Sequence, residues 1–266
     1  MTVLLNLLRV LAAGVWTTIV GAPLVVALYS RYWYGLLQAK LGRRDRLDQA
    51  LEANAHLAGW VAQRLWAGVL LGLAGIRLRV REVVPVDWST AHVVCANHAS
   101  IFDILALVCA VPPPFRFVAK RELLSWPIIG WALRPAGQIV IDRADHSGAL
   151  RSIAQAAVRK IRGQVIFFVE GTRTRTGQLL PFKKGAFHFA IDNHLPILPT
   201  AVCGSYSALA KLPWWRLRPG RHIEILFCRS IPPPARAEYN GSGAMVEELL
   251  EATRDQNAGA LAAADA

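Results

Sequence analysis

The chain has 266 residues, 54% of them hydrophobic, and its 30 Lys and Arg against 18 Asp and Glu give a formal net charge of +12 at pH 7. This length allows one catalytic domain with an additional segment, and the mean hydropathy of +0.32 is high for a freely soluble protein. The charge favours an anionic partner. The apolar excess favours lipid over nucleic acid, because no nucleic-acid-binding module is recognisable and the aromatic residues lie in apolar runs.

Residues 3–29 are almost wholly apolar and are long enough to cross a hydrocarbon core of ~30 Å as a helix. A signal peptide is disfavoured because no basic residues precede this stretch, which is also too long for a signal-peptide core. The segment that follows combines a cation, Arg31, with amphipathic aromatic residues, as is typical of the water–lipid interface. These aromatic residues are Tyr29, Tyr32, Trp33 and Tyr34.

A second apolar helix is predicted over residues 55–75, although Gln63 and Arg64 interrupt its apolar character. Residues 1–75 are therefore predicted to form a membrane-associated two-helix region. Two arrangements remain open, a hairpin that crosses the bilayer and a hairpin that lies within one leaflet. A buried helical pair in a soluble protein is the third alternative.

From residue 76 the pattern changes, because apolar residues alternate with arginines at the period of a half-buried strand. Further strands are predicted over 92–96, 115–118, 138–141, 164–169, 197–202 and 222–227. Helices are predicted over 101–110, 120–133, 147–162, 185–193 and 242–254. This alternation predicts an α/β domain over residues 76–255, with a mostly parallel or mixed central sheet flanked by helices. The alanine-rich residues 256–266 are predicted to be a disordered tail.

The four cysteines, at positions 95, 109, 203 and 228, form no close pair and lie in apolar neighbourhoods. Buried reduced thiols are the favoured interpretation, which is compatible with a location on the cytosolic side of a membrane. The histidines show no metal-ligand spacing with acidic or cysteine partners, so we expect no metal site.

His98 lies five residues before Asp103 and directly after the apolar run 93–96. On a regular helix this spacing places the two side chains on poorly matched faces. The spacing fits better if His98 lies on a turn and Asp103 lies in the first turn of a helix that Asn97 or Ser100 caps. The carboxylate could then bind one imidazole nitrogen and leave the other free to take a proton from an alcohol. On spacing alone, a structural or unpaired role is the alternative.

A second candidate segment, residues 170–173, follows the buried strand predicted over 165–169. Functional loops of open α/β sheets gather at the carboxyl ends of strands. The glycine of this segment permits close backbone approach, and Arg173 offers a bidentate fork for a phosphate group. Lys120, at the end of another predicted strand, could add positive charge to the same pocket. A solvated basic turn and a surface lysine are the alternatives.

Four sequence blocks in this order resemble the glycerolipid acyltransferase superfamily, and specifically the bacterial 1-acylglycerol-3-phosphate acyltransferases. The resemblance covers roughly residues 75–205, and position 174 is threonine where the family often has serine. The blocks are residues 97–103, similar to a His-x-x-x-x-Asp motif, then 120–143, 170–173 and 195–200.

The resemblance implies a catalytic pair and a substrate-binding set. The pair consists of His98, the general base, and Asp103, which supports it. Two cations of the binding set would hold the phosphate of the acceptor, and its other members would shape the pocket. The binding set is Lys120, Glu170, Gly171, Thr172 and Arg173.

The same resemblance implies transfer of a fatty acyl group from acyl-ACP or acyl-CoA to the sn-2 hydroxyl of lysophosphatidic acid, which gives phosphatidic acid without a cofactor. It also implies a location at the inner (cytoplasmic) membrane with the active site on the cytoplasmic face. Another lysolipid acceptor, such as lyso-ornithine lipid, is an alternative because such enzymes share the first motif. A lipid hydrolase is a weaker alternative, since no Gly-x-Ser-x-Gly nucleophile elbow is present. A non-catalytic membrane-binding protein is the last alternative.

Overall fold

The computed structural model describes residues 2–142, 163–210, 216–232 and 243–265. In this part of the chain seven strands form one sheet in the order β1-β7-β6-β2-β5-β3-β4. Neighbouring strands are parallel except for β6 and β7, so the predicted α/β class with a mostly parallel or mixed sheet is confirmed. The strands are β1 (Arg77–Glu82), β2 (Val93–Ala96), β3 (Phe115–Lys120), β4 (Ile139–Ile141), β5 (Gln164–Phe168), β6 (Ile197–Cys203) and β7 (His222–Phe227).

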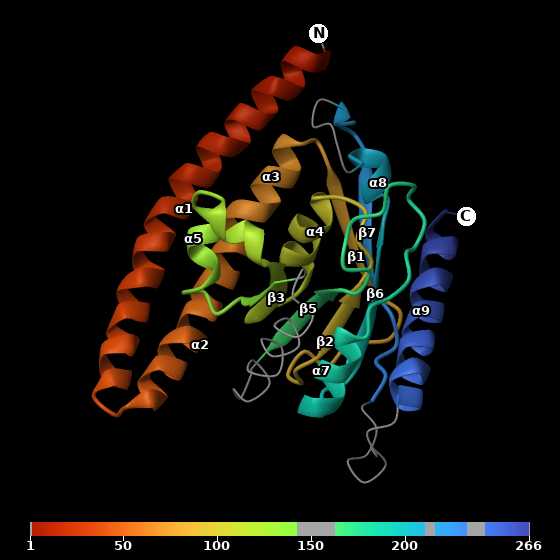
Figure 1. The fold of residues 1–266 in the computed structure, drawn as a ribbon. Coiled ribbons are helices and arrows are strands. Elements are labelled where there is room, and N and C mark those ends of the chain that lie inside the picture. Colours follow the sequence, from red (N-terminus) through yellow and green to blue (C-terminus); the bar gives the residue numbers. More distant parts are fainter. Residues whose placement is uncertain (1, 143–162, 211–215, 233–242, 266) are drawn as a thin grey trace.

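Helices flank this sheet and precede it in the chain (Figure 1). The N-terminal ones are α1 (Thr2–Lys40), α2 (Arg44–Val61), the π-helical segment η1 (Ala62–Ala67) and α3 (Gly68–Leu73). The others are α4 (Phe102–Ala110), the 3-10 helix η2 (Arg121–Ser125), α5 (Ile129–Leu133), α7 (Gly185–Asn193), α8 (Ser205–Ala208) and α9 (Gly243–Asp265). The helix predicted over 147–162 lies outside the described residues.

The prediction of a continuous helix over 120–133 is wrong, because the chain forms η2 and α5 with a break between them. Trp126 precedes Pro127, and its backbone is extended at φ −76° and ψ 126°. Proline disfavours the helical conformation of the residue before it, which accounts for the interruption.

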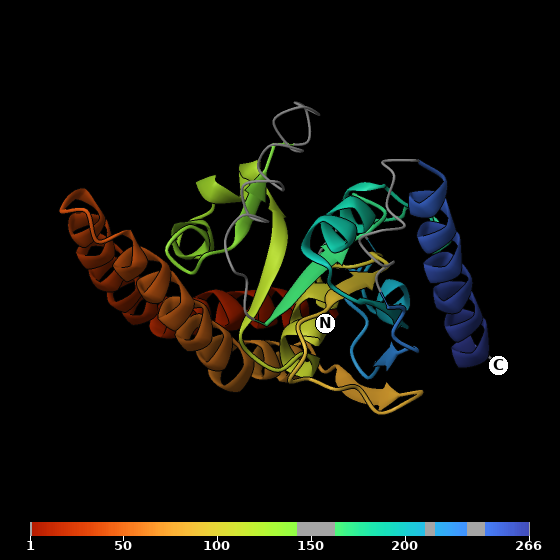
Figure 2. The same cartoon turned by 90° about the horizontal axis from the view of Figure 1, so that it is seen from below.

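Successive residues of the central strands face opposite sides of the sheet, which gives the domain three layers. Val94 and Ile166 pack in the core cluster that contains residues of α3 and α4. Val93 and Val165 pack in the second cluster, which contains residues of α7 and α9. Figure 2 shows α9 and the N-terminal helices on opposite sides of the sheet.

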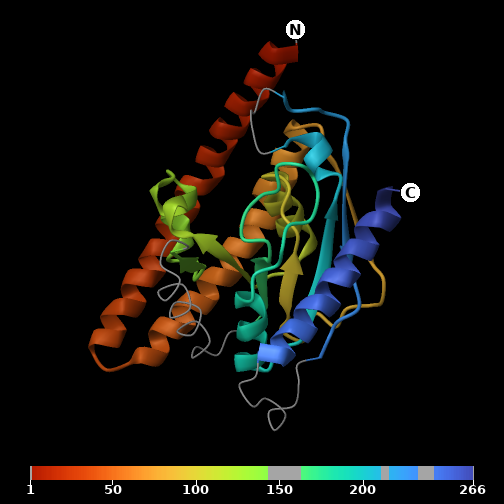
Figure 3. The same ribbon diagram turned by 45° about the vertical axis from the view of Figure 1, so that its right-hand side comes forward.

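The two N-terminal helices form an antiparallel hairpin, as Figures 1 and 3 show. The second helix begins at Arg44, earlier than predicted, and its continuation packs on the domain: Gln63 donates to the carbonyl oxygen of Cys109 at 3.0 Å. Among the described helices, α1 is long and apolar enough to cross a membrane, with a window of mean hydropathy 2.0 that is 0% buried. This exposed apolar helix is compatible with membrane association, and its depth in a bilayer stays a prediction.

The predicted disordered tail is wrong, because α9 continues through the alanine-rich segment to Asp265. Alanine has the highest helix propensity, and the segment also has tertiary contacts. Asn257 is buried and donates to the carbonyl oxygen of Cys95 at 3.2 Å, and Leu261 packs against a small cluster around Ala201. The C-terminal helix therefore belongs to the layer that covers the sheet.

Candidate active site

The turn after β2 is fixed to a neighbouring strand by Asn97, which is buried. Its amide nitrogen donates to the carbonyl oxygen of Val202 in β6 at 3.0 Å, and its amide oxygen accepts from the N–H of Val202 at 2.7 Å. Asn97 was predicted as a possible helix cap, and this pairing shows that it has a different role. It extends the contact between β2 and β6 beyond the end of β2 and so fixes the backbone just before His98.

His98 lies on this turn and Asp103 lies in the first turn of α4, as predicted. Imidazole Nδ1 is 2.8 Å from Oδ2 of Asp103, whose side chain is fully buried. An ionised carboxylate only accepts hydrogen bonds, so Nδ1 carries the proton and Nε2 is left as the basic nitrogen. The imidazole is 13% exposed, and Nε2 forms no hydrogen bond to any residue in the described ranges. Nε2 therefore has its acceptor capacity unused within these ranges.

Asp103 also organises the backbone of the turn. Its Oδ2 accepts hydrogen bonds from the N–H of Ala99 at 2.6 Å and of Ser100 at 2.8 Å. The Ser100 hydroxyl accepts from the N–H of Phe102 at 3.3 Å, so the cap that was predicted for Ser100 is present in a long form. The Ser100 hydroxyl satisfies the first N–H of α4, and the Asp103 carboxylate satisfies two N–H groups of the turn before the helix. The carboxylate that holds the imidazole therefore also holds the turn that carries it.

One face of the imidazole is covered by an aromatic ring that sequence reasoning missed. Phe168, the last residue of β5, stacks on His98 with the ring centroids 3.9 Å apart and an angle of 16° between the planes. The register explains the contact, because Ala96 pairs with Phe168 and the chain leaves both strands side by side. Phe168 excludes water from this face of the ring, and its π-electrons favour a positive charge on the imidazole.

Glu170 lies two residues beyond β5 and is buried. Its carboxylate accepts hydrogen bonds from the N–H of His98 at 2.7 Å and from the N–H of Leu180 at 2.9 Å. The N–H of Thr174 donates to the carbonyl oxygen of His98 at 2.9 Å. The loop after β5 therefore holds the backbone of His98 on both sides.

Burial raises the pKa of the Glu170 carboxyl above its usual value of 4.5, although its hydrogen bonds with His98 and Leu180 act in the opposite direction. A raised folded-state pKa means that the contribution to stability is fully present below pH 4.5 and is lost as the pH rises through the folded-state pKa. Glu170→Gln removes this titration and one hydrogen-bond acceptor. Thermal unfolding should be measured for both proteins from acid to neutral pH. We expect the difference in melting temperature, wild type minus variant, to decrease as the pH rises. A constant difference would contradict this assignment.

The remaining residues of the loop are placed around this backbone contact. Gly171 has φ +73°, a conformation that favours glycine, and its N–H bonds the carbonyl oxygen of Phe168 at 2.9 Å. Thr172 is exposed and Arg173 is half-buried. Thr174, the next residue, donates its N–H to the carbonyl oxygen of His98. Arg173 is therefore one residue away from a direct contact with the backbone of His98.

Lys120 is placed differently from the other candidates. It ends β3, which pairs with β5 only as far as Phe117 and then pairs with β4. Its Nζ lies 2.7 Å from Oε1 of Glu122, and the lysine side chain is 47% exposed. Within the described part of the chain it forms no hydrogen bond or ion pair with His98 or the 170–174 loop. Its predicted role in binding substrate phosphate stays a prediction.

The described residues contain no group of three or more His, Cys, Asp or Glu that could hold a metal ion. All four cysteines are free, and burial raises the pKa of the Cys109 and Cys228 thiols to about 11. These thiols stay protonated at neutral pH and are poor nucleophiles. The chemistry of this site therefore centres on His98.

Comparison with known proteins agrees with this geometry. Residues 76–203, which carry His98, Asp103 and the 170–174 loop, match the family model described as Acyltransferase. Residues 76–203 are therefore similar to the acyltransferase family. This acyltransferase domain is similar to curated proteins named 1-acyl-sn-glycerol-3-phosphate acyltransferase from Cocos nucifera (38% identity, 46% of this chain and 41% of the relative) and Saccharomyces cerevisiae (31%, 67% and 57%).

A human relative, named 1-acyl-sn-glycerol-3-phosphate acyltransferase alpha, is 39% identical over 50% of this chain and 48% of the relative. The chain spans about half the length of the curated relatives it matches. Its fold is similar to the crystal structure of the 1-acyl-sn-glycerophosphate acyltransferase PlsC from Thermotoga maritima, with a TM-score of 0.63, 23% identity, and 95% and 94% of the two chains covered. That similarity extends over the N-terminal hairpin as well as the acyltransferase domain.

Proposed function

We propose that this acyltransferase transfers a fatty acyl group from an acyl thioester to the sn-2 hydroxyl of 1-acylglycerol-3-phosphate, which gives phosphatidic acid. The observation that carries the proposal is the 2.8 Å contact between Nδ1 of His98 and Oδ2 of Asp103, which leaves Nε2 without a hydrogen bond in the described ranges. The names of the relatives support this acceptor. The donor is acyl-ACP or acyl-CoA.

In this mechanism Nε2 of His98 takes the proton of the acceptor hydroxyl, and the oxygen attacks the carbonyl carbon of the thioester. The C–O bond forms, the C–S bond breaks, and the leaving thiolate takes the proton back from the imidazolium. The carboxylate of Asp103 and the ring of Phe168 stabilise the imidazolium while it exists. No protein nucleophile is needed, because the substrate supplies the attacking oxygen.

We further propose that α1 attaches the enzyme to the cytoplasmic membrane, with the active site on the cytoplasmic face. The acceptor is a lipid whose acyl chain stays in the leaflet, so attachment brings the site to its substrate. The exposed apolar side chains along α1 support this placement. The net charge of +12 would enrich an anionic lysolipid and an acidic carrier protein nearby.

Purified protein should be incubated with labelled acyl-ACP or acyl-CoA and a panel of lysolipids, and the products identified by mass spectrometry. We expect phosphatidic acid with lysophosphatidic acid and little product with neutral lysolipids. Preference for lyso-ornithine lipid would replace the proposed acceptor. Release of free fatty acid at the same rate with and without an acceptor would identify a hydrolase instead.

Arg173→Ala is expected to raise the KM for lysophosphatidic acid by about 10- to 100-fold with a much smaller change in kcat, because one charge-assisted contact with the phosphate is lost. Steady-state kinetics with varied acceptor would measure this. Arg175→Ala is the matched control, since it removes the same charge from an exposed position of the same loop. Equal effects of the two substitutions on KM would exclude a specific role for Arg173.

A further inference from the structure

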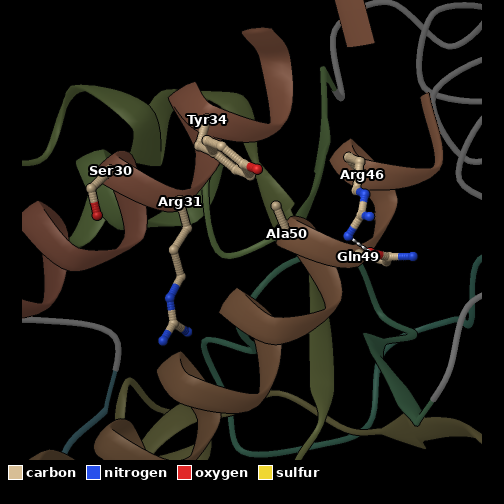
Figure 4. Close-up of a pocket in the computed structure, with 6 residues that line it drawn as sticks. All are labelled: Ser30, Arg31, Tyr34, Arg46, Gln49 and Ala50. Carbon is tan, nitrogen blue, oxygen red and sulfur yellow. Dashed lines mark hydrogen bonds between the residues drawn. The ribbon is translucent and has the colours of Figure 1, made fainter. Parts of the chain in front are cut away.

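A second candidate binding site lies in the N-terminal hairpin, where α1 and α2 approach their connecting turn. A groove of about 340 Å³ opens there, within the size range of small-ligand sites. Figure 4 shows the residues that line it: Ser30, Arg31, Tyr34, Arg46, Gln49 and Ala50. We refer to this site as the hairpin groove.

The hairpin groove offers hydrogen-bond donors and positive charge, and no carboxylate lines it. Arg31 is exposed and forms no hydrogen bond or ion pair within the part of the chain that the structure describes. Arg46 donates to the amide oxygen of Gln49 at 3.3 Å, which leaves the amide nitrogen of Gln49 as a donor. Arg31 and Arg46 come from facing helices, and Figure 4 shows their guanidinium groups apart, with that of Arg46 turned to Gln49. Each guanidinium can bind phosphate oxygens in pairs.

The surroundings of the groove identify the source of that phosphate. Trp33, Tyr34, Leu37 and Leu41 are 56–65% exposed along the same stretch of helix and turn. Residues 31–50 also contain five cationic and two acidic side chains. Exposed aromatic and apolar residues mixed with cations are typical of the membrane interface, whereas a nucleic-acid surface would not need the exposed leucines.

The hairpin groove is separate from the candidate active site. In Figures 1 and 3 the turn between α1 and α2 lies at the lower end of the molecule, whereas α8, which follows the carboxyl end of β6, lies at the upper end. The carboxyl end of β2, which carries His98, faces the same way as that of β6, because the two strands are parallel. A phosphate in the groove is therefore not the acceptor phosphate during acyl transfer.

We propose that the hairpin groove binds the headgroup phosphate of an anionic membrane phospholipid through Arg31 and Arg46. The proposal rests on the membrane attachment inferred under the proposed function, and adds a specific headgroup contact to it. The enzyme would then bind an anionic leaflet more tightly than a zwitterionic one. Apolar contacts of α1 alone would give no such preference.

The test is flotation of the full-length protein with vesicles of phosphatidylcholine, with or without phosphatidylglycerol. For Arg31→Gln/Arg46→Gln we expect binding to anionic vesicles to fall by about 10- to 30-fold, since each arginine near the surface contributes about five-fold. Binding to pure phosphatidylcholine should change little. The matched control is Arg229→Gln/Arg254→Gln, which removes the same charge from exposed positions outside the hairpin and should lower binding far less.

Equal losses for the two double variants would overturn the proposal, as would unchanged binding of the groove variant. A titration with inorganic phosphate, followed by NMR, separates the sources: saturation by free phosphate without preference for anionic vesicles would assign the groove to a soluble phosphate compound. Binding to a homopolymeric RNA as tight as that to the vesicles would also count against lipid. Two further measurements separate this proposal from the enzymatic one, because His98→Ala should still bind vesicles and the groove variant should still acylate acceptor dissolved in detergent.

Discussion

Replacement of His98 by alanine is expected to lower kcat by about 10²- to 10⁴-fold, the usual contribution of a positioned general base. The imidazole supplies the one open basic nitrogen of the pair, Nε2, while Nδ1 is held by Asp103 at 2.8 Å. Without it, the acceptor hydroxyl has no proton acceptor at this position. The change should be measured as the initial rate of phosphatidic acid formation with saturating acceptor and donor.

A matched control is His222→Ala, because His222 begins β7 and its side chain is exposed. This variant should keep nearly wild-type activity. His98→Ala should still fold cooperatively in thermal unfolding, since the Glu170 and Thr174 contacts involve the backbone of residue 98. Full activity of a correctly folded His98→Ala protein would refute the proposed mechanism.

Replacement of Asp103 by alanine is expected to reduce activity as severely and to destabilise the protein as well. The substitution leaves the N–H groups of Ala99 and Ser100 buried without their acceptor, at a cost of about 1–3 kcal/mol for each. It also frees the imidazole of His98 to rotate. Denaturant unfolding and acyl-transfer kinetics on the same preparation would measure both effects.

Asp103→Asn separates these two effects, because a single oxygen, Oδ2, accepts all three hydrogen bonds and an amide oxygen can take its place. We expect this variant to keep most of the stability and to lose about 10- to 100-fold in kcat, since a neutral amide stabilises the imidazolium less than a carboxylate does. Wild-type activity of Asp103→Asn would show that the charge of Asp103 has no role in catalysis.

Local patterns in the sequence predicted the strands well. Each of the seven predicted strands overlaps an observed one, because short apolar runs between turn residues identify buried strands. The order of the strands was not predictable, since β3 changes partner after Phe117 and β7 runs antiparallel to β6. Such pairings depend on contacts between distant segments, which the periodicity of one segment does not encode.

The C-terminal helix is a second case in which local sequence patterns were not sufficient, because residues 256–266 were predicted to be disordered. Residues 256–265 have no apolar periodicity, and their composition of small residues suggested disorder. High helix propensity and the buried contact of Asn257 with Cys95, 162 residues away in sequence, give helix instead. Helix propensity alone would have predicted this helix correctly, and the tertiary contact of Asn257 stabilises the helix.

In the candidate site, the sequence predicted the contact between His98 and Asp103, because the two residues are close along the chain. The contacts that surround this pair come from the loop after β5, about 70 residues further on. Glu170 was expected to shape a substrate pocket, whereas the structure shows its carboxylate bonded to two backbone N–H groups. The stacking of Phe168 on the imidazole depends on β2 and β5 being neighbours, which no local signal reveals.

The hydrogen bonds between the turn at 97–103 and the loop at 170–174 run in both directions, since Glu170 accepts from His98 and Thr174 donates to it. The two segments therefore hold each other in position and form one structural unit. An engineer who wishes to change the acceptor of this enzyme by exchanging the second segment with that of a relative would have to transplant the first along with it. A graft of one alone would shift His98 relative to the proposed acceptor.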